Sequence, residues 1–167
     1  SVNVMSNDDM PGTVVYEGRA YYDVGMRVKG SERGRDNSAR RSYIIHFHED
    51  ELFRGVQATL ALDRSGGIRY STSPYGQDEI LIYHFINRAG DIPSMYNDLV
   101  YLAAPSTASS PNGTAILQMA RYEDVFLDSQ YRNGSEGTLF EYDLIYYPTT
   151  STGGAEGLKL PQPDNVV

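Results

Sequence analysis

The basic residues of this chain are concentrated in one short stretch. Half of its 14 lysines and arginines lie between Arg19 and Arg41, although the whole chain carries a net charge of -8. Within this stretch a glycine-containing loop follows one strand-like segment, and two adjacent arginines begin the next. Glycine lets backbone N–H groups approach an anion closely, and fixed positive charge strengthens such a site. The candidate phosphate-binding residues are therefore Gly30, Ser31, Gly34, Arg40 and Arg41.

The same loop also fits a solvated turn between two strands, and both interpretations stay open at this point. Arg40 and Arg41 begin a strand, so their side chains should point to opposite faces. Arg41 would share a face with Tyr43 and Phe47, and we favour it as the ligand-facing arginine. Arginine holds phosphate through a planar fork whereas lysine offers a point charge, so the residue type affects how an anion is bound.

Glu79 is the acidic candidate, and it lies in the first turn of a helix predicted from Gln77 to Arg88. Acidic residues at its start, with Gly90 and Pro93 after its end, favour these bounds. The apolar stripe expected to face a sheet consists of Ile82, Phe85, Ile86 and Ala89. Glu79 continues the inward side of the helix, which suits a salt bridge to the basic strand. The alternative is an acidic residue placed there only by the helix dipole.

The elements that would position these residues are mostly strands. Gly18 marks the turn of a hairpin between Thr13–Tyr16 and Ala20–Lys29. Further strands are predicted at Ser42–Phe47, Gly55–Leu62, Met95–Ala103, Thr114–Ala120 and Thr138–Tyr147, with a short helix at Tyr122–Gln130. This order predicts an α+β fold, a twisted antiparallel sheet of about five strands with one packed helix. Residues 1–12 are expected to form a tail, residues 13–147 one domain, and residues 148–167 a Gly/Pro/Thr-rich segment.

Composition narrows the possible functions. The chain has no cysteine, which excludes disulfides and zinc–thiolate sites. No apolar run approaches the roughly 20 residues that span a bilayer, so we expect a soluble protein without a membrane partner. The acidic balance disfavours nucleic acid as a partner, because the basic stretch is too small for a duplex. His46 and His48 share a strand face, but no third ligand is evident, so no metal site is predicted.

Several segments together resemble one known family. In chain order they are VGMRVKGS (Val24–Ser31), RRSYIIHF (Arg40–Phe47), LFRGVQATLAL (Leu52–Leu62), DEILIYHFINRAG (Asp78–Gly90) and NGTAILQMARYEDVFL (Asn112–Leu127). They resemble the CotH family of spore-coat-type, kinase-like proteins, over about residues 13–147. Glu79 stands at the family's helix glutamate. The chain departs from the family pattern in two places. Arg40 and Arg41 stand where lysines are usual, and Glu32, Arg33 and Gly34 stand where a denser Asn/Ser loop is usual.

The resemblance implies the N-terminal lobe of an atypical protein kinase, with ATP and a divalent metal, Mg or Mn, as cofactors. It also implies protein substrates and a secreted, cell-surface or spore-surface location. The aspartates that bind metal in kinases lie in a second lobe, and nothing after Tyr147 is long enough to build one. We therefore expect the chain alone to be inactive. The alternative function is a non-catalytic structural or interaction module of a coat or surface assembly, and the chain could be part of a longer protein.

Overall fold

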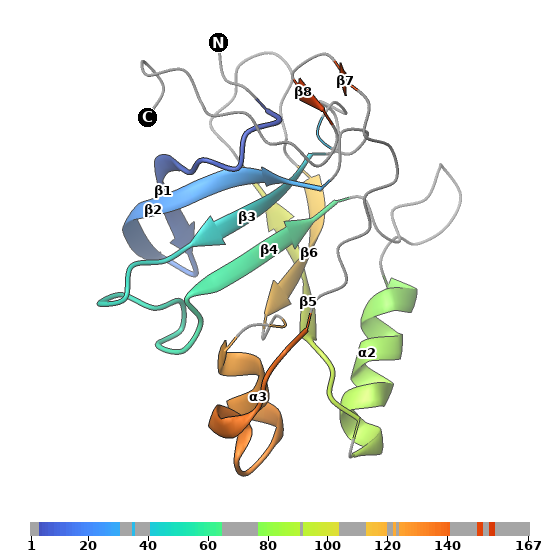
Figure 1. The fold of residues 1–167 in the computed structure, drawn as a ribbon. Helices are drawn as coiled ribbons and strands as arrows, with labels where there is room; N and C mark the ends of the chain where they lie inside the picture. Colours follow the sequence, from blue (N-terminus) through green and yellow to red (C-terminus); the bar gives the residue numbers. More distant parts are fainter. Residues whose placement is uncertain are drawn as a thin grey trace.

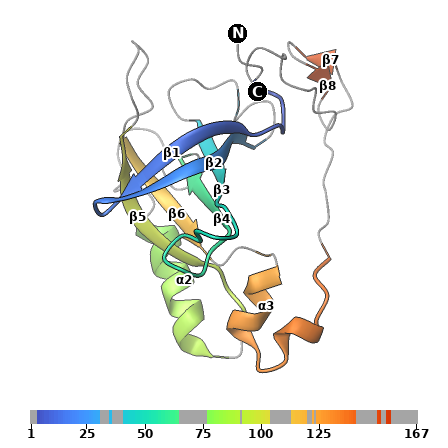
Figure 2. The ribbon, with the colours of Figure 1, turned by 90° about the vertical axis from the view of Figure 1, so that its left-hand side faces the viewer.

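The fold is an α+β arrangement dominated by one antiparallel sheet. The computed structural model describes residues 4–30, 35, 41–64, 77–90, 92–103, 113–119, 122, 124–140, 150–151 and 154–155. Within them, six strands form a sheet in the order β1-β2-β3-β4-β6-β5. The strands are β1 (Met10–Tyr16), β2 (Arg19–Lys29), β3 (Ser42–His46), β4 (Thr59–Asp63), β5 (Tyr96–Leu102) and β6 (Gly113–Met119). The sheet is strongly twisted, so that β1 and β2 cross the direction of β5 and β6 (Figures 1 and 2).

The first hairpin forms as the sequence predicts, but it begins earlier. Glu17 and Gly18 both have positive φ angles, 49° and 80°, which is the geometry of a two-residue turn between tightly paired strands. Strand β1 starts at Met10, inside the range expected to be a tail. The extension is possible because Met10, Pro11 and Gly12 pair with residues of the long strand β2.

One face of the sheet carries the apolar core. Phe53, Tyr21 and Phe47 meet there, with ring centroids 5.2–5.6 Å apart. The residues buried in this cluster are Tyr21, Val24, Ile45, Phe47, Phe53, Leu60, Leu62, Ala115, Leu117 and Met119. Because side chains alternate along a strand, the opposite face of β2, β3, β4 and β6 carries a different set of residues. We call this opposite side the outer face.

Helix α2 (Gln77–Ala89) follows the predicted bounds to within one residue and contacts β5 (Figure 1). Its predicted apolar stripe is wrong at three of four positions, because Ile82 and Phe85 are 56% and 62% exposed and Ala89 is exposed as well. The half-buried residues on the helix are Glu79, Ile80, Tyr83 and Ile86. Apolar residues occur on more than one side of this helix, so periodicity alone could not decide which side meets the sheet.

The strand count also differs from the prediction of about five. Met10–Tyr16 and Thr59–Asp63 both join the main sheet, which gives it six strands. The short helix is present as α3 (Asp124–Gln130), followed by a single 3-10 turn η1 (Gly134–Glu136). The predicted strand Thr138–Tyr147 is not formed at residues 138–140, and the rest of it lies outside the described residues. Two short strands, β7 (Thr150–Ser151) and β8 (Gly154–Ala155), pair with each other.

Candidate functional site

Three of the six predicted site residues can be placed, and two of them, Gly30 and Arg41, are linked through Arg35. Gly30 follows β2 directly and has a φ of 106°, a conformation that favours glycine. Arg41 precedes β3, and its Nε donates a 2.9 Å hydrogen bond to the Arg35 carbonyl oxygen. Glu79 lies on α2. The other three, Ser31, Gly34 and Arg40, lie outside the described residues.

A polar network on the outer face lies next to Gly30. Lys29, the last residue of β2, places its Nζ 2.6 Å from Asp63 Oδ2 and 3.2 Å from Gln118 Oε1. The strand register explains this meeting, because Lys29 pairs with Ser42 across β2–β3. The Ser42 hydroxyl in turn lies 3.3 Å from Asp63 Oδ1. The Lys29 ammonium is thus held by side chains of β4 and β6, and Ser42 of β3 supports Asp63.

Asp63 and Gln118 are both buried, at 8% and 6% exposure. Charged and amide groups at such depth are stable only when they are paired. In this network the ammonium of Lys29 supplies donors to both. The network therefore fixes the direction of the Lys29 side chain, directly before the turn at Gly30.

Glu79 approaches this network from the helix. Burial raises the pKa of the Glu79 carboxyl, and the neighbouring Asp63 carboxylate raises it further, while Lys29 opposes both effects. The ion pair formed among these described residues is nevertheless Lys29–Asp63, not Lys29–Glu79. We expected a salt bridge from Glu79 to the basic strand. Arg41 does not form it, because its Nε bonds to the Arg35 carbonyl oxygen, and Arg40 lies outside the described residues.

Arg41 instead acts on Tyr43. Its charge, together with that of Arg64, opposes the rise that burial causes in the pKa of Tyr43. Tyr43 packs against the core cluster. The charge that acts on Glu79 is that of Lys29.

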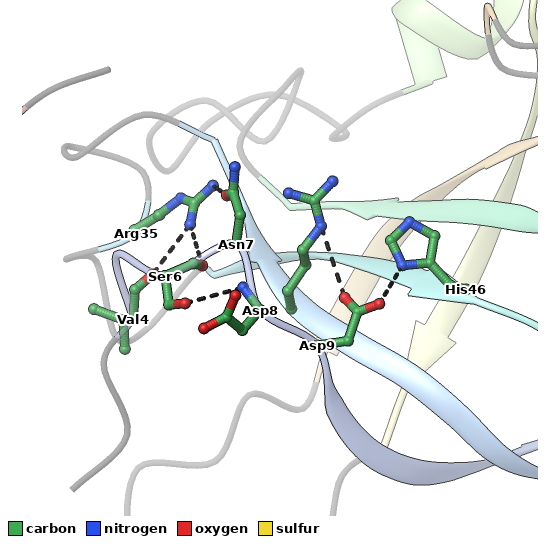
Figure 3. Close-up of polar contacts among 8 residues, drawn as sticks. Val4, Ser6, Asn7, Asp8, Asp9, Arg35 and His46 are labelled. Atoms are coloured by element: carbon green, nitrogen blue, oxygen red, sulfur yellow. Dashed lines mark hydrogen bonds and ion pairs between the residues drawn. The ribbon is translucent and has the colours of Figure 1, made fainter. Parts of the chain in front are cut away.

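Arg35 connects the glycine-containing loop to the N-terminal segment, residues Val4–Asp9. It is only 3% exposed. Its guanidinium donates to the Gly30 carbonyl oxygen at 2.5 Å. It also donates to the Ser6 carbonyl oxygen and to Asn7 Oδ1, both at 2.7 Å (Figure 3). Burial lowers the pKa of Arg35, and the neighbouring Arg27 lowers it further. The Arg35 guanidinium bonds to backbone carbonyl oxygens and to Asn7, so it does not contact a ligand in this conformation.

The two histidines singled out earlier have separate environments. His46 ends β3, and its Nδ1 lies 2.7 Å from Asp9 Oδ2 (Figure 3). His48 is exposed beyond the strand. Among the described residues no group of three or more metal-ligating side chains gathers. None of the helices described is long and apolar enough to cross a membrane.

Comparison of the chain with protein-family models, with curated proteins and with solved structures gives no significant match.

Lys29, Asp63 and Gln118 were not singled out by the sequence. Lys29 belongs to the basic stretch, but no local pattern distinguishes it from the other basic residues there. Asp63 gave a weak signal, since it ends the alternating apolar run Gly55–Leu62 with a charged residue. Gln118 interrupts the apolar strand β6 in the same way. Only the strand order places β2, β4 and β6 so that these three side chains meet.

Proposed function

We propose that this chain is the nucleotide-binding lobe of a CotH-like, kinase-type protein, and that Lys29 and the backbone at Gly30 contact the phosphates. The observation that carries the proposal is the Lys29 network, with Glu79 of α2 beside it. Protein kinases pair a strand lysine with a helix glutamate, and a glycine-rich loop covers the phosphates. The proposal moves the phosphate-contacting charge from Arg40 and Arg41 to Lys29.

The electrostatics of the network support this role. The Lys29 ammonium forms an ion pair with the Asp63 carboxylate, and the Glu79 carboxyl group lies near both. An approaching phosphate would compete with these carboxylates for Lys29. The site therefore needs Glu79 or Asp63 to turn away or to take up a proton when an anion binds. For the same reason we expect weak binding by the chain alone, with a Kd of about a millimolar, or about 4 kcal/mol.

The described residues fit the phosphate part of a nucleotide better than the metal part. Lysine and the N–H groups of a glycine turn are suited to phosphate oxygens. A divalent metal requires several oxygen ligands, and the described residues offer no such cluster. The proposal therefore assigns no metal ligand to them. Phosphoryl transfer by a parent protein, with ATP as donor and a protein as acceptor, remains part of the proposal through the family resemblance.

Calorimetric titration of the chain with ATP tests this function. Lys29→Met should abolish the heat, because it removes the ammonium. Arg41→Ala should weaken binding much less than Lys29→Met, because the Arg41 Nε is already bonded to the Arg35 carbonyl oxygen. Arg132→Ala, at an exposed position, is the matched control for lost positive charge. Absence of binding at millimolar ATP, or equal losses in all three variants, would contradict the proposal.

A second candidate function is a non-catalytic interaction module of a surface or coat assembly. It is favoured by exposed aromatic residues on α2 and β5, among them Phe85 and Tyr101, the latter 72% exposed. Large exposed apolar groups often mark association surfaces. Sedimentation of the chain at increasing concentration tests this candidate. Self-association that disappears in Phe85→Ser and Tyr101→Ser would support it, and a monomer at all concentrations would argue against self-assembly through this surface.

A further inference from the structure

Asp9, from the N-terminal segment, lies on the outer face between two basic side chains. Its Oδ2 is 2.7 Å from His46 Nδ1, and its Oδ1 is 3.8 Å from Arg27 Nε. Figure 3 shows the carboxylate turned toward the His46 ring. Below it, Gly25 pairs with His46 in the β2–β3 register. We call Gly25, Arg27 and His46 the oxyanion seat.

Gly25 lies directly beneath the Asp9 carboxylate and forms the base of the seat. A Cβ at this position would lie 2.6 Å from Asp9 Oδ2, closer than real Cβ contacts come. Only glycine leaves room here for an anionic oxygen against the strand. The basic groups on either side of it come from β2 and β3, whose pairing fixes their separation. The seat is therefore built by the sheet itself, and Asp9 only fills it.

The carboxylate of Asp9 fills the seat imperfectly. Asp9 Oδ1 and Arg27 Nε are both buried, and neither has a hydrogen-bond partner. Their separation of 3.8 Å is too long for a hydrogen bond, whereas charge-assisted bonds to guanidinium are usually about 2.7–2.9 Å. A carboxylate tied to the backbone cannot approach His46 and Arg27 equally. A free oxyanion with three or four oxygens can rotate to serve both.

We propose that the oxyanion seat is a binding site for a phosphate-type anion, and that Asp9 occupies it as a built-in competitor. The N-terminal segment is anchored just before Asp9, because Arg35 bonds to Ser6 and Asn7. This anchoring keeps Asp9 at a high effective concentration beside the seat. The inference goes beyond the proposed nucleotide site and does not depend on it, although Arg27 is only two positions from Lys29 on the same face of β2.

Titration with inorganic phosphate tests the seat. Asp9→Ala is compared with Asp50→Ala, which removes the same charge from an exposed turn. We expect Asp9→Ala to bind phosphate at least about 10-fold more tightly than Asp50→Ala, because the competitor is gone. Adding His46→Ala or Arg27→Met to Asp9→Ala should remove this gain.

Equal phosphate affinity in Asp9→Ala and Asp50→Ala would overturn the proposal, and so would a gain that survives His46→Ala. Asp9→Asn, which keeps the side-chain shape, provides the same comparison if Asp9→Ala does not fold.

Lys29→Met in the Asp9→Ala background separates the two proposals. If the seat is correct, the phosphate gain persists in this double variant. If the nucleotide site is wrong but the seat is right, Lys29→Met has no effect on ATP while the Asp9→Ala gain remains.

Discussion

At the scale of single residues, the chemistry of the outer face depends on how each cation is held. Lys29 is balanced by the buried carboxylate of Asp63, whereas Arg35 donates to backbone carbonyl oxygens and to Asn7. Arg27 lies beside a carboxylate that it does not reach with a hydrogen bond. The three basic side chains therefore differ in how readily they can receive a new anion. Arg35 is the least available, and Arg27 has an unfilled donor.

Lys29→Met should destabilise the protein by about 3 kcal/mol, because it leaves Asp63 buried without its cation. The side chains of Lys29 and Asp63 are 25% and 11% exposed, so water compensates only partly. Arg19→Met is the matched control, since it breaks the more exposed Arg19–Glu51 pair. That change should cost less than about 1 kcal/mol. Urea unfolding of both variants measures the difference, and similar losses would contradict the assigned burial of the Lys29 pair.

At the scale of elements, α2 meets the sheet through a side that includes a carboxyl group. The half-buried residues Glu79, Tyr83 and Ile86 are spaced by three or four positions, as one face of a helix requires. Glu79 thereby lies beside Asp63 and Lys29 rather than in solvent. The packing of α2 against the sheet therefore depends on whether the Glu79 carboxyl group is ionised.

Glu79→Gln should change how stability depends on pH. The folded-state pKa of Glu79 is raised above the ordinary value of 4.5 by burial, with a further rise caused by Asp63. The folded protein therefore binds this proton more tightly than the unfolded chain does. The stabilising contribution is complete below the ordinary pKa and is lost as pH rises through the raised value.

The free energy of unfolding of Glu79→Gln, relative to the original chain, should thus increase between about pH 4 and about pH 7. Glu49→Gln, at an exposed position, controls for the loss of one negative charge. Denaturant unfolding at the two pH values provides the measurement. A relative stability that stays constant or decreases with pH would show that Glu79 does not face the Asp63 network.

At the scale of the whole molecule, the two sides of the sheet differ in their composition. The aromatic cluster around Phe53 stabilises the twisted sheet from one side. The outer face carries the charged residues together with the buried apolar side chains of Ile44, Ala61 and Ile116. Any function of the outer face depends on polar groups held within partly apolar packing.

Phe53→Ala should lower the free energy of unfolding by about 3–5 kcal/mol, the usual cost of removing a buried phenyl ring. Phe53 is 1% exposed and contacts the rings of Tyr16, Tyr21 and Phe47. Phe140→Ala removes the same group from a position that is 93% exposed and should change stability by less than about 0.5 kcal/mol. Thermal unfolding followed by circular dichroism compares them, and an inverted order would place the core elsewhere.

Met5→Ala should cost about 2 kcal/mol or more, although Met5 lies in the range expected to be a tail. Met5 is 1% exposed, so the N-terminal segment is part of the packed structure. Val15→Ala, at a side chain 68% exposed, is the control within β1. Urea unfolding of the two variants distinguishes a packed segment from a loose tail, for which Met5→Ala would have no effect.

The sequence by itself determined the local elements. The Glu17–Gly18 turn, the alternating strands and the capped helix are set by φ preferences and by periodicity within a few residues. These local signals were sufficient to predict an antiparallel α+β fold. They also located the basic stretch, the turn at Gly30 and the helix that carries Glu79, but they began the third strand too early, because Arg41 precedes β3.

Only the tertiary structure decided which of these residues meet. Strand order is a long-range property, and it alone brings Lys29 of β2 to Asp63 of β4 and Gln118 of β6. The side of α2 that packs was ambiguous in the sequence, because apolar residues occur on several sides of it. Asp9 reaches His46 across 37 positions of chain, a contact that no local pattern contains. Charged side chains pair through space, so the partners of Lys29 and His46 follow from sheet topology and not from spacing along the chain.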